Sequence, residues 1–316
     1  MNKDRVDISF VVPAYNEEKF IEQCLASILK QAKKSNISFE IIVVNNNSTD
    51  QTKEIVSKFK EVQLIDEFQK GLTFARQAGF LKSKGKLIAN LDADVILPEK
   101  WIETVIREFN KDKNLVALSG PQIYYDVSKK ILITQKIFYA IAYLTYLINK
   151  YILNKSSMLQ GGNFVVRKDA LLSIGGFNTK ILFWGEDTDI AKRLHQVGNV
   201  KFTFKLPIYA SGRRLLREGV IKTGWRYVLN YFSVIFLNKP FHNEINISSN
   251  NLIFSKINKI HFYLEDNKLK IIFSSGLLIA LIGLSYFVFS RYLNFNFDFK
   301  NKAKQFKAEI VNILKK

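Results

Sequence analysis

Residues 8–18 read Ile-Ser-Phe-Val-Val-Pro-Ala-Tyr-Asn-Glu-Glu, an apolar run that ends in a polar turn. The short run of apolar and β-branched residues predicts a buried strand over Ile8–Val12. The next segment, Phe20–Lys30, has apolar residues at the spacing of a helix. A strand that leads through a polar turn into a helix is the repeating unit of a sheet covered by helices, and this stretch therefore sets the expected fold.

The same order repeats along the first half of the chain. Glu40–Val44 and Leu87–Leu91 have the character of buried strands, Leu64–Ile65 is a shorter strand-like run, and Thr52–Phe59 has helical spacing. The alternation predicts an α/β fold, Rossmann-like, with a mainly parallel central sheet and flanking helices. In such sheets ligands bind beyond the carboxyl ends of the strands, so the loops that follow the strands are expected to carry the site.

Composition limits the classes of protein and partner. The chain has 316 residues, 47% hydrophobic and 24% charged, which excludes a disordered chain. Its one cysteine, Cys24, excludes an internal disulfide and a zinc site built on paired cysteines. The 47 Lys and Arg against 28 Asp and Glu give a net charge of +19, which predicts attraction to nucleic acid, anionic lipid or a phosphate-bearing substrate. Because the basic residues gather around apolar segments and no nucleic-acid module is recognisable, nucleic acid is not an expected partner.

Two acidic motifs are the strongest chemical signals. Asp92 and Asp94 follow the strand Leu87–Leu91, and carboxylates at this spacing suit Mg²⁺ or Mn²⁺, although solvated loop carboxylates have the same pattern. Glu186 and Asp187 open a helical segment beside an aromatic residue. Helix capping explains acidic residues there, and desolvation by the aromatic ring would also raise a carboxylate pKa toward the range of a general base.

Six stretches, in this order, resemble glycosyltransferase family 2 with the GT-A fold: FVVPAYNEEKFIEQCLASIL, IIVVNNNSTDQT, GLTFARQAG, GKLIANLDADV, GGNFVVRKDALLSIGGF and WGEDTDIAKRL. The resemblance runs from about Ile8 to Arg226. It implies an enzyme that moves a sugar from a nucleotide-diphospho-sugar to a hydroxyl of a glycan or lipid-linked acceptor, with inversion. It implies a divalent metal, Mg²⁺ or Mn²⁺, as cofactor.

The resemblance also implies a role for each matching residue. The donor nucleotide site consists of Pro13, Ala14, Glu17, Asn45, Arg76 and Asp92. Asp94, with Asp92, holds the metal, and Arg213 and Arg214 close over the diphosphate. The acceptor and sugar side consists of Gly162, Asn163 and Trp184, with Asp187 as the general base and Glu186 positioning the acceptor or the base. One position departs from the family, which usually carries Asp where this chain has Asn45, and that Asp commonly contacts the uracil of a uridine donor.

A second part of the chain resembles a membrane segment. Residues 271–289, IIFSSGLLIALIGLSYFVF, are uncharged and about long enough to cross a bilayer, with a buried core helix as the alternative. The expected organisation is a catalytic domain over 1–230, an amphipathic linker over 231–270, a transmembrane or re-entrant helix over 271–289 and a basic tail over 290–316.

No secretory signal precedes the first strand, so the catalytic domain is expected at the cytoplasmic face of the membrane. The seven basic residues of the tail favour the cytoplasm as well. One spanning helix would put the catalytic domain and the tail on opposite sides of the membrane, so the topology stays open. Two shorter runs, 137–149 and 225–237, suit helices that lie in the headgroup layer or pack on the core.

Two other functions remain open from the sequence. A polyprenyl-phosphate monosaccharide synthase would use a lipid phosphate directly as acceptor, but an ionised phosphate needs no general base such as Asp187. An inactive, membrane-bound interaction protein would have had no need to keep the carboxylates Asp92, Asp94, Glu186 and Asp187.

Overall fold

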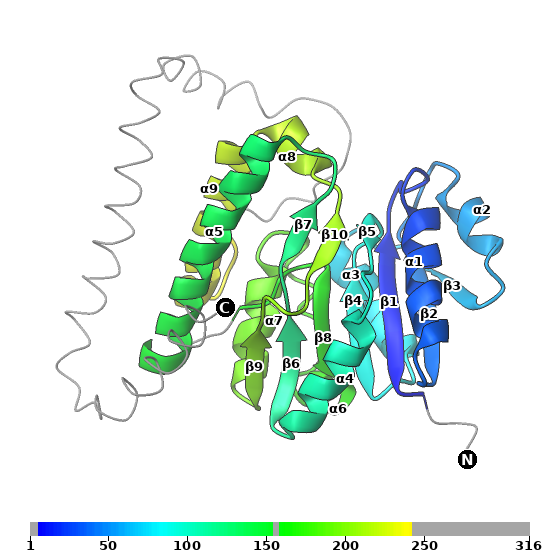
Figure 1. Ribbon diagram of the computed structural model, residues 1–316, viewed down its shortest axis with the longest axis horizontal. Helices are drawn as coiled ribbons and strands as arrows, with labels where there is room; N and C mark the ends of the chain where they lie inside the picture. The colour runs from blue at the N-terminus through cyan, green and yellow to red at the C-terminus, as the bar shows by residue number, and fades with distance from the viewer. Residues whose placement is uncertain (1–5, 154–157, 242–316) are drawn as a thin grey trace. The chain divides into compact units, whose positions relative to one another are not determined.

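A computed structural model describes residues 6–153 and 158–241 (Figure 1). The chain divides into two compact units, Met1–Ile245 and Asn246–Lys316, and all the described residues belong to the first. The expected membrane segment 271–289, the basic tail 290–316 and most of the expected linker 231–270 lie outside the described residues. The boundary expected at residue 230 falls inside helix α9, Val220–Leu237, which joins the expected catalytic domain to the start of the linker.

Seven strands form the central sheet, in the order β3-β2-β1-β4-β8-β6-β9. Strands β3, β2, β1 and β4 run parallel to their neighbours, β8 is antiparallel to β4 and β6, and β6 is parallel to β9. The strands are β1 Ile8–Ala14, β2 Phe39–Asn45, β3 Val62–Asp66, β4 Leu87–Leu91, β6 Leu115–Ser119, β8 Asn163–Arg167 and β9 Asn199–Phe202. The expected α/β fold with a mainly parallel sheet is confirmed, and the predicted strands lie within β1, β2, β3 and β4.

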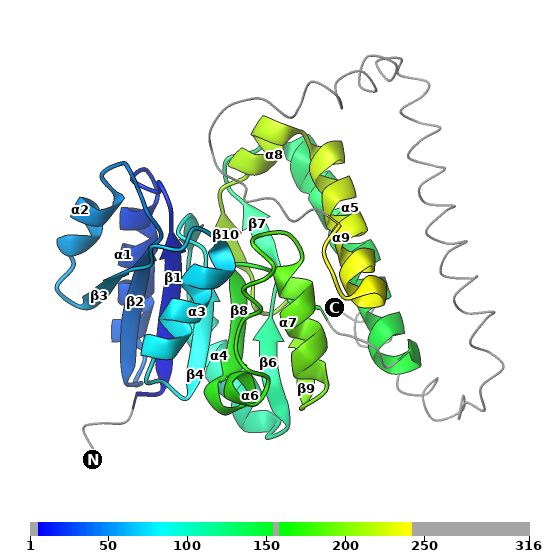
Figure 2. The same ribbon diagram turned by 180° about the vertical axis from the view of Figure 1, so that it is seen from behind.

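The sheet has an apolar core on each face. Phe10 and Val12 of β1 belong to one core and Val11, between them, belongs to the other, because successive side chains of a strand point to opposite faces. The first core is covered by α1 Ile21–Lys34, α2 Thr52–Ser57 and α4 Trp101–Lys111, and the second by α3 Leu72–Lys82, α6 Lys168–Ser173 and α7 Glu186–His195. Figure 1 shows α1 and α4 in front of the sheet, and the reverse view in Figure 2 shows α3 and α7. Burial on both faces explains why the strands are continuous apolar runs.

A second sheet of three short strands continues from the carboxyl ends of β4 and β6. Its order is β5-β10-β7, with β5 Val95–Ile96, β7 Gln122–Tyr124 and β10 Ile208–Ala210. Since β5 follows the Asp92–Asp94 turn directly and β10 leads into helix α8, Arg213–Glu218, this sheet brings the start of α8 to the acidic turn. The backbone N–H of Ser211 donates to the carbonyl oxygen of Asp94 at 3.3 Å.

Two long helices pack beside the sheet. Helix α5, Lys129–Leu147, continues into a π-helical turn, Ile148–Leu153, and lies beside α9 in both views (Figures 1 and 2). The side-chain amide of Asn149 donates to the Tyr231 hydroxyl at 2.5 Å. The predicted runs 137–149 and 225–237 thus lie in two neighbouring helices.

Candidate active site

The carboxyl ends of three parallel strands bring the predicted donor residues to one edge of the sheet. Ala14 at the end of β1 is in register with Asn45 at the end of β2, and the N–H of Asn46 donates to the Ala14 carbonyl at 2.8 Å. Pro13 and Ala14 are buried within β1, so they contribute to this edge of the sheet through their backbone. The antiparallel pairing of Leu91 with Asn163 places the start of β8 opposite the end of β4. Residues 161 and 162 therefore lie beside Asp92.

Arg76 of α3 joins the two acidic motifs. Its Nη2 atom lies 3.1 Å from Asp92 Oδ1 and its Nη1 atom lies 3.1 Å from Glu186 Oε1, and the side chain is only 1% exposed. The motifs that follow β4 and open α7 therefore meet at one buried guanidinium. An arginine so enclosed has little surface left for a ligand, and its position indicates that it holds the two motifs in place.

The carboxylates at the start of α7 lie in a poorly solvated environment. Asp187 Oδ2 accepts a hydrogen bond from the Gly161 N–H at 3.3 Å, and Oδ1 accepts one from the Thr188 N–H at 2.7 Å. Burial raises the pKa of Asp187, against these hydrogen bonds and the Arg76 charge. Burial also raises the pKa of Glu186 to about 8, the Asp187 charge adds to this effect, and Arg76 opposes it. The pair therefore favours holding one proton at neutral pH, which a general base beside a neutral partner requires.

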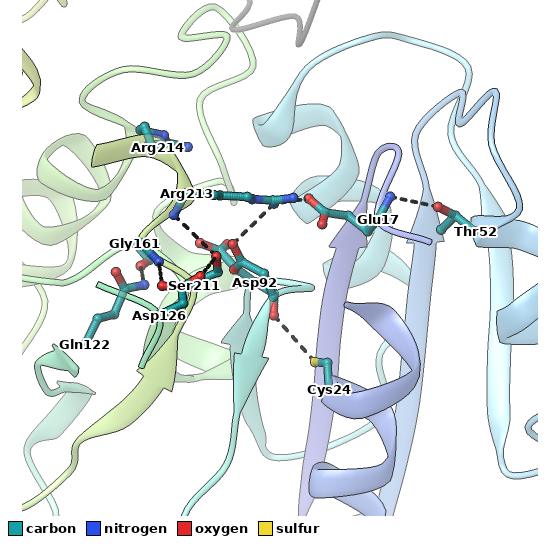
Figure 3. A network of polar contacts seen from close by, with 12 residues as sticks. Glu17, Cys24, Thr52, Asp92, Gln122, Asp126, Gly161, Ser211, Arg213 and Arg214 are labelled. Carbon is teal, nitrogen blue, oxygen red and sulfur yellow. Dashed lines mark hydrogen bonds and ion pairs between the residues drawn. The ribbon is translucent and has the colours of Figure 1, made fainter. Parts of the chain in front are cut away.

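Arg213 spans the carboxylates on the donor side. Its Nη2 atom pairs with Glu17 and lies 3.2 Å from Asp94 Oδ2, and Figure 3 shows the side chain extended toward Glu17. Burial raises the pKa of Glu17 to about 7 and that of Asp94 to about 6, in both cases against the Arg213 charge. These values indicate that one guanidinium does not fully balance the buried carboxylates.

The same carboxylates fit a divalent metal. Glu17 Oε2 is buried and has no hydrogen-bond partner among the described residues. Carboxylate oxygens are the ligands that Mg²⁺ and Mn²⁺ prefer, and Asp92 and Asp94 offer such oxygens from a single turn. Within residues 6–153 and 158–241 no group of three or more His, Cys, Asp or Glu side chains is arranged to hold a metal ion. A metal on Asp92 and Asp94 would therefore take its other ligands from water or substrate phosphate, as Mg²⁺ commonly does.

Arg214 has different surroundings from its neighbour Arg213. Its guanidinium lies over the rings of Phe183 and Trp184, 4.7 and 5.6 Å from their centroids, and Nη1 donates to the Tyr227 hydroxyl at 3.2 Å. Arg213 thus faces Glu17 and Asp94, whereas Arg214 lies on the aromatic wall that includes the buried Trp184. The sequence assigned both arginines to the diphosphate and did not distinguish them.

The loop before α8 is held by a residue that the sequence did not single out. Asp126 accepts hydrogen bonds from the Ser211 hydroxyl at 2.5 Å and from the Gly212 N–H at 2.6 Å. Figure 3 shows Asp126 and Ser211 below Arg213. Because Gly212 directly precedes α8, Asp126 sets where that helix begins and so where Arg213 lies. Nothing in its local sequence marks this role.

Asn163 is part of the framework. The side chain is fully buried, and its amide donates to the carbonyl oxygens of Gly120 at 2.9 Å and Leu206 at 2.8 Å. Its Oδ1 accepts from Trp101 Nε1 at 3.2 Å. The side chain predicted to lie near the sugar therefore joins β8 to two loops.

Gly162 allows β8 to begin against Asp92. Its φ is +75°, and a Cβ atom there would overlap the Asp92 carboxylate. Gly162→Ala is expected to destabilise the protein by about 1–2 kcal/mol through the left-handed backbone, and to weaken metal-dependent donor binding by about 10–100-fold by displacing Asp92. Calorimetric titration of the donor with Mn²⁺ measures the second effect. Gly175→Ala is the matched control, because Gly175 has φ +76° with no atom within 4 Å of its Cβ position. An equal loss of donor affinity in both variants would contradict the role of Asp92.

The orientation of the Asn45 amide is set by its neighbours. Nδ2 donates to Asp66 Oδ1 at 2.8 Å, and Oδ1 accepts from the Ser48 N–H at 3.1 Å. Asp66 also pairs with Lys53 at 2.7 Å. An aspartate at position 45 would face the Asp66 carboxylate, so the departure from the family pattern is explained by the acidic residue at the end of β3. The sequence contained this signal, because Asp66 follows a strand-like run, but it was not singled out.

A match to a family model decides the family. The model described as glycosyl transferase family 2 matches residues 9–175, more than half of the chain. The chain belongs to glycosyltransferase family 2. A second model, described as the N-terminal domain of galactosyltransferase, matches residues 148–209 of this glycosyltransferase, the stretch with Gly161, Glu186 and Asp187.

Relatives and solved structures agree with the family. The glycosyltransferase is 27% identical over 217 residues to the probable glycosyltransferase YdaM of Bacillus subtilis, which covers 62% of this chain and 48% of YdaM. It is 26% identical over 196 residues to glycosyltransferase AglE of Haloferax volcanii, which covers 60% of this chain and 62% of AglE. The chain therefore spans less than two thirds of the length of either relative.

The fold resembles that of solved glycosyltransferases. S. aureus TarS 1-349 has a TM-score of 0.51 at 18% identity, over 75% of this chain and 67% of that one. GalNAc-T7, solved with UDP, GalNAc and Mn²⁺, has a TM-score of 0.50 at 16% identity, over 66% of this chain and 44% of that one. The expected GT-A fold is confirmed.

Proposed function

We propose that this family 2 glycosyltransferase moves a sugar from a nucleoside-diphosphate sugar to a hydroxyl group of a glycan or lipid-linked acceptor, with inversion at the anomeric carbon. The observation that carries the proposal is the meeting of the two acidic motifs at Arg76. Direct displacement needs a base on one face of the sugar and stabilisation of the leaving group on the other. The geometry supports such a site, with Asp94 and Asp92 on one side of Arg76 and Glu186 and Asp187 on the other.

On the donor side, the edge formed by Pro13, Ala14 and Asn45 receives the nucleotide, and Asp92 lies next to the ribose. Asp94, with Asp92, would hold Mg²⁺ or Mn²⁺, which when bound supplies positive charge to the departing diphosphate. Arg213, already extended over Glu17 and Asp94, contributes a guanidinium to the same phosphate oxygens. Structural neighbours support a nucleotide donor, since TarS was solved with UDP and GalNAc-T7 with UDP, GalNAc and Mn²⁺.

On the acceptor side, Asp187 takes the proton from the acceptor hydroxyl as its oxygen attacks the anomeric carbon. The bond to the diphosphate oxygen breaks on the opposite face, and the electron pair leaves with the diphosphate. Glu186, with its raised pKa, stays protonated and holds the neighbouring Asp187 in position. The Gly161 N–H orients the Asp187 carboxylate, and Trp184 offers an apolar wall to the sugar. A hydroxyl acceptor suits this site better than a lipid phosphate, because a buried carboxylate repels an ionised phosphate.

A location at the cytoplasmic face of a membrane fits the basic composition, because the cytoplasmic leaflet is anionic, and it fits the apolar segment 271–289. An acceptor carried on a polyprenyl phosphate or diphosphate, as in the synthesis of cell-surface polysaccharide, would be presented at that surface. The net charge of +19 supports attraction to the phosphate of such a lipid.

A thermal-shift screen tests the donor half of the proposal. UDP, GDP, CDP and ADP are added to the full chain with and without Mn²⁺, and one of them is expected to raise the melting temperature only when Mn²⁺ is present. Asp94→Asn is expected to abolish that rise, whereas Asp189→Asn, a carboxylate on α7 that pairs with Arg193 at 2.8 Å, is expected to keep it. No shift with any nucleotide, or a shift that is independent of metal and of Asp94, would contradict the proposed site.

A further inference from the structure

One face of α5 is apolar and exposed. Ile133, Ile137, Ile141 and Leu144, which we call the α5 stripe, are between 38% and 59% exposed. Their spacing of four, four and three residues places them on one side of the helix, over a length of about 16 Å. Soluble proteins seldom leave such a continuous apolar row in water, and an exposed row of this kind marks an interaction surface.

The opposite face of α5 packs against the rest of the catalytic domain. Tyr139, Tyr146 and Leu147 are buried, and the Tyr139 ring stacks on Phe202 of β9 at 6.1 Å. By length and composition the stretch Lys129–Tyr151 would suffice to cross a membrane. A helix with one face packed on a folded domain is not surrounded by lipid, however, so the stripe is suited to a surface that it touches from one side.

Charge identifies the chemistry of that surface. Lys129, Lys130 and Lys136 are exposed on α5, and residues 127–168 contain no Asp or Glu. Lysines in the first turn oppose the helix dipole, which favours acidic residues at that end, so local helix stability does not account for them. An apolar row flanked by lysines, without acidic residues, complements an anionic lipid surface, with the row in the acyl boundary and the lysines at the phosphates.

The stripe lies one helix away from the proposed acceptor side. Phe138, next to Ile137, contacts Tyr227 at 6.5 Å between ring centroids, and Tyr227 contacts Trp184 at 5.5 Å. A second connection runs through Tyr139, whose hydroxyl donates to Gln160 Oε1 at 2.9 Å and accepts from the Gln122 N–H at 2.9 Å. Gln122 Nε2 in turn donates to the carbonyl oxygen of Gly161, the residue that orients Asp187.

We propose that the α5 stripe lies in the headgroup layer of an anionic membrane and so holds the acceptor side of the catalytic domain at the lipid surface. This contact is separate from segment 271–289 and does not depend on the transfer chemistry. Docking through α5 fixes the distance between the lipid surface and the proposed acceptor side.

Site-specific fluorescence in the full chain tests the proposal. The native Cys24 is buried, and burial raises the pKa of its thiol, so it does not compete for a thiol-reactive probe. Ile137→Cys is labelled with an environment-sensitive fluorophore and mixed with vesicles of phosphatidylcholine and phosphatidylglycerol in equal parts. The emission is expected to shift to the blue, to increase several-fold and to be quenched by spin-labelled lipid.

The matched control is Leu172→Cys on α6. Leu172 is 56% exposed and Ile137 is 57% exposed, but α6 follows β8 at the edge of the sheet where β4 begins, away from the site. Its fluorophore is expected to stay unquenched under the same conditions. Melting temperatures of both labelled variants confirm that the fold is kept.

Further results support or overturn the proposal. Combined substitution of Lys129, Lys130 and Lys136 by glutamate, or vesicles of phosphatidylcholine alone, is expected to abolish the response at position 137. Equal responses at 137 and 172 would overturn the proposal, as would a chain that sediments with vesicles while the probe at 137 stays in water. A blue-shifted probe at 137 before vesicles are added would show that another protein segment covers the stripe, which also overturns it. Donor binding in the thermal-shift screen is unaffected by any of these outcomes.

Discussion

Replacing Asp187 with asparagine is expected to lower kcat by about 10²–10⁴-fold, the usual contribution of a general base. Asparagine keeps the shape and accepts the Gly161 hydrogen bond, but it does not take a proton from the acceptor. The metal and nucleotide residues lie on the other side of Arg76, so donor affinity is expected to stay near that of the wild type. Steady-state kinetics with calorimetric titration of the donor measure both quantities.

The pH profile gives this prediction a second readout. Burial raises the pKa of Asp187, and the reaction uses its ionised form, so the wild-type rate is expected to fall as the pH drops through that raised pKa. The residual activity of Asp187→Asn is expected to lack this acidic limb. Asp189 lies two residues further along α7 and pairs with Arg193, so Asp189→Asn serves as the control. This variant is expected to keep the wild-type rate and the acidic limb of the pH profile. Full turnover by Asp187→Asn would remove this residue from the role of base.

Replacing Arg76 with methionine is expected to lower the free energy of unfolding by about 3 kcal/mol. Methionine fills much of the space but leaves the buried Glu186 and the partly exposed Asp92 without their shared cation. Most of the loss is expected from the buried Glu186 carboxyl, because its Oε1 atom loses its hydrogen-bond donor, whereas water still reaches Asp92 and screens its charge. Urea denaturation followed by tryptophan fluorescence reports on the change, since Trp101 and Trp184 are buried in the folded protein.

A double substitution separates charge from packing. Arg76→Met combined with Glu186→Met is expected to be more stable than Arg76→Met alone, because the buried side chain at position 186 then no longer needs a hydrogen-bond donor. Arg76→Lys, which keeps the charge but reaches one carboxylate at a time, is expected to lie between the wild type and Arg76→Met. A methionine variant as stable as the wild type would contradict the structural role of Arg76.

The sequence predicted which strand ends carry polar residues, but it did not predict the surroundings of each polar side chain. The strand ends that carry Glu17, Asn45 and Asp92 follow from apolar periodicity, because parallel strands put their carboxyl ends at one edge. Arg76, assigned from the family to the donor, is enclosed between two carboxylates. Asn163, assigned to the sugar, holds two loops through its amide. The local sequence of a polar side chain does not tell whether it turns to solvent or to the interior.

The sequence by itself determined the order of strands and helices, the chemistry at the strand ends and the membership in glycosyltransferase family 2, because these depend on local periodicity and on ordered motifs. Only the tertiary structure decided that Glu186 and Asp92 share Arg76, that Arg213 and Arg214 face different walls, and that one side of α5 is exposed among the described residues. These features depend on how β8 runs against β4 and on how α7, α8 and α9 pack over the sheet edge. Contacts between residues so far apart in the chain arise from the packing of whole elements, which no short stretch of sequence contains.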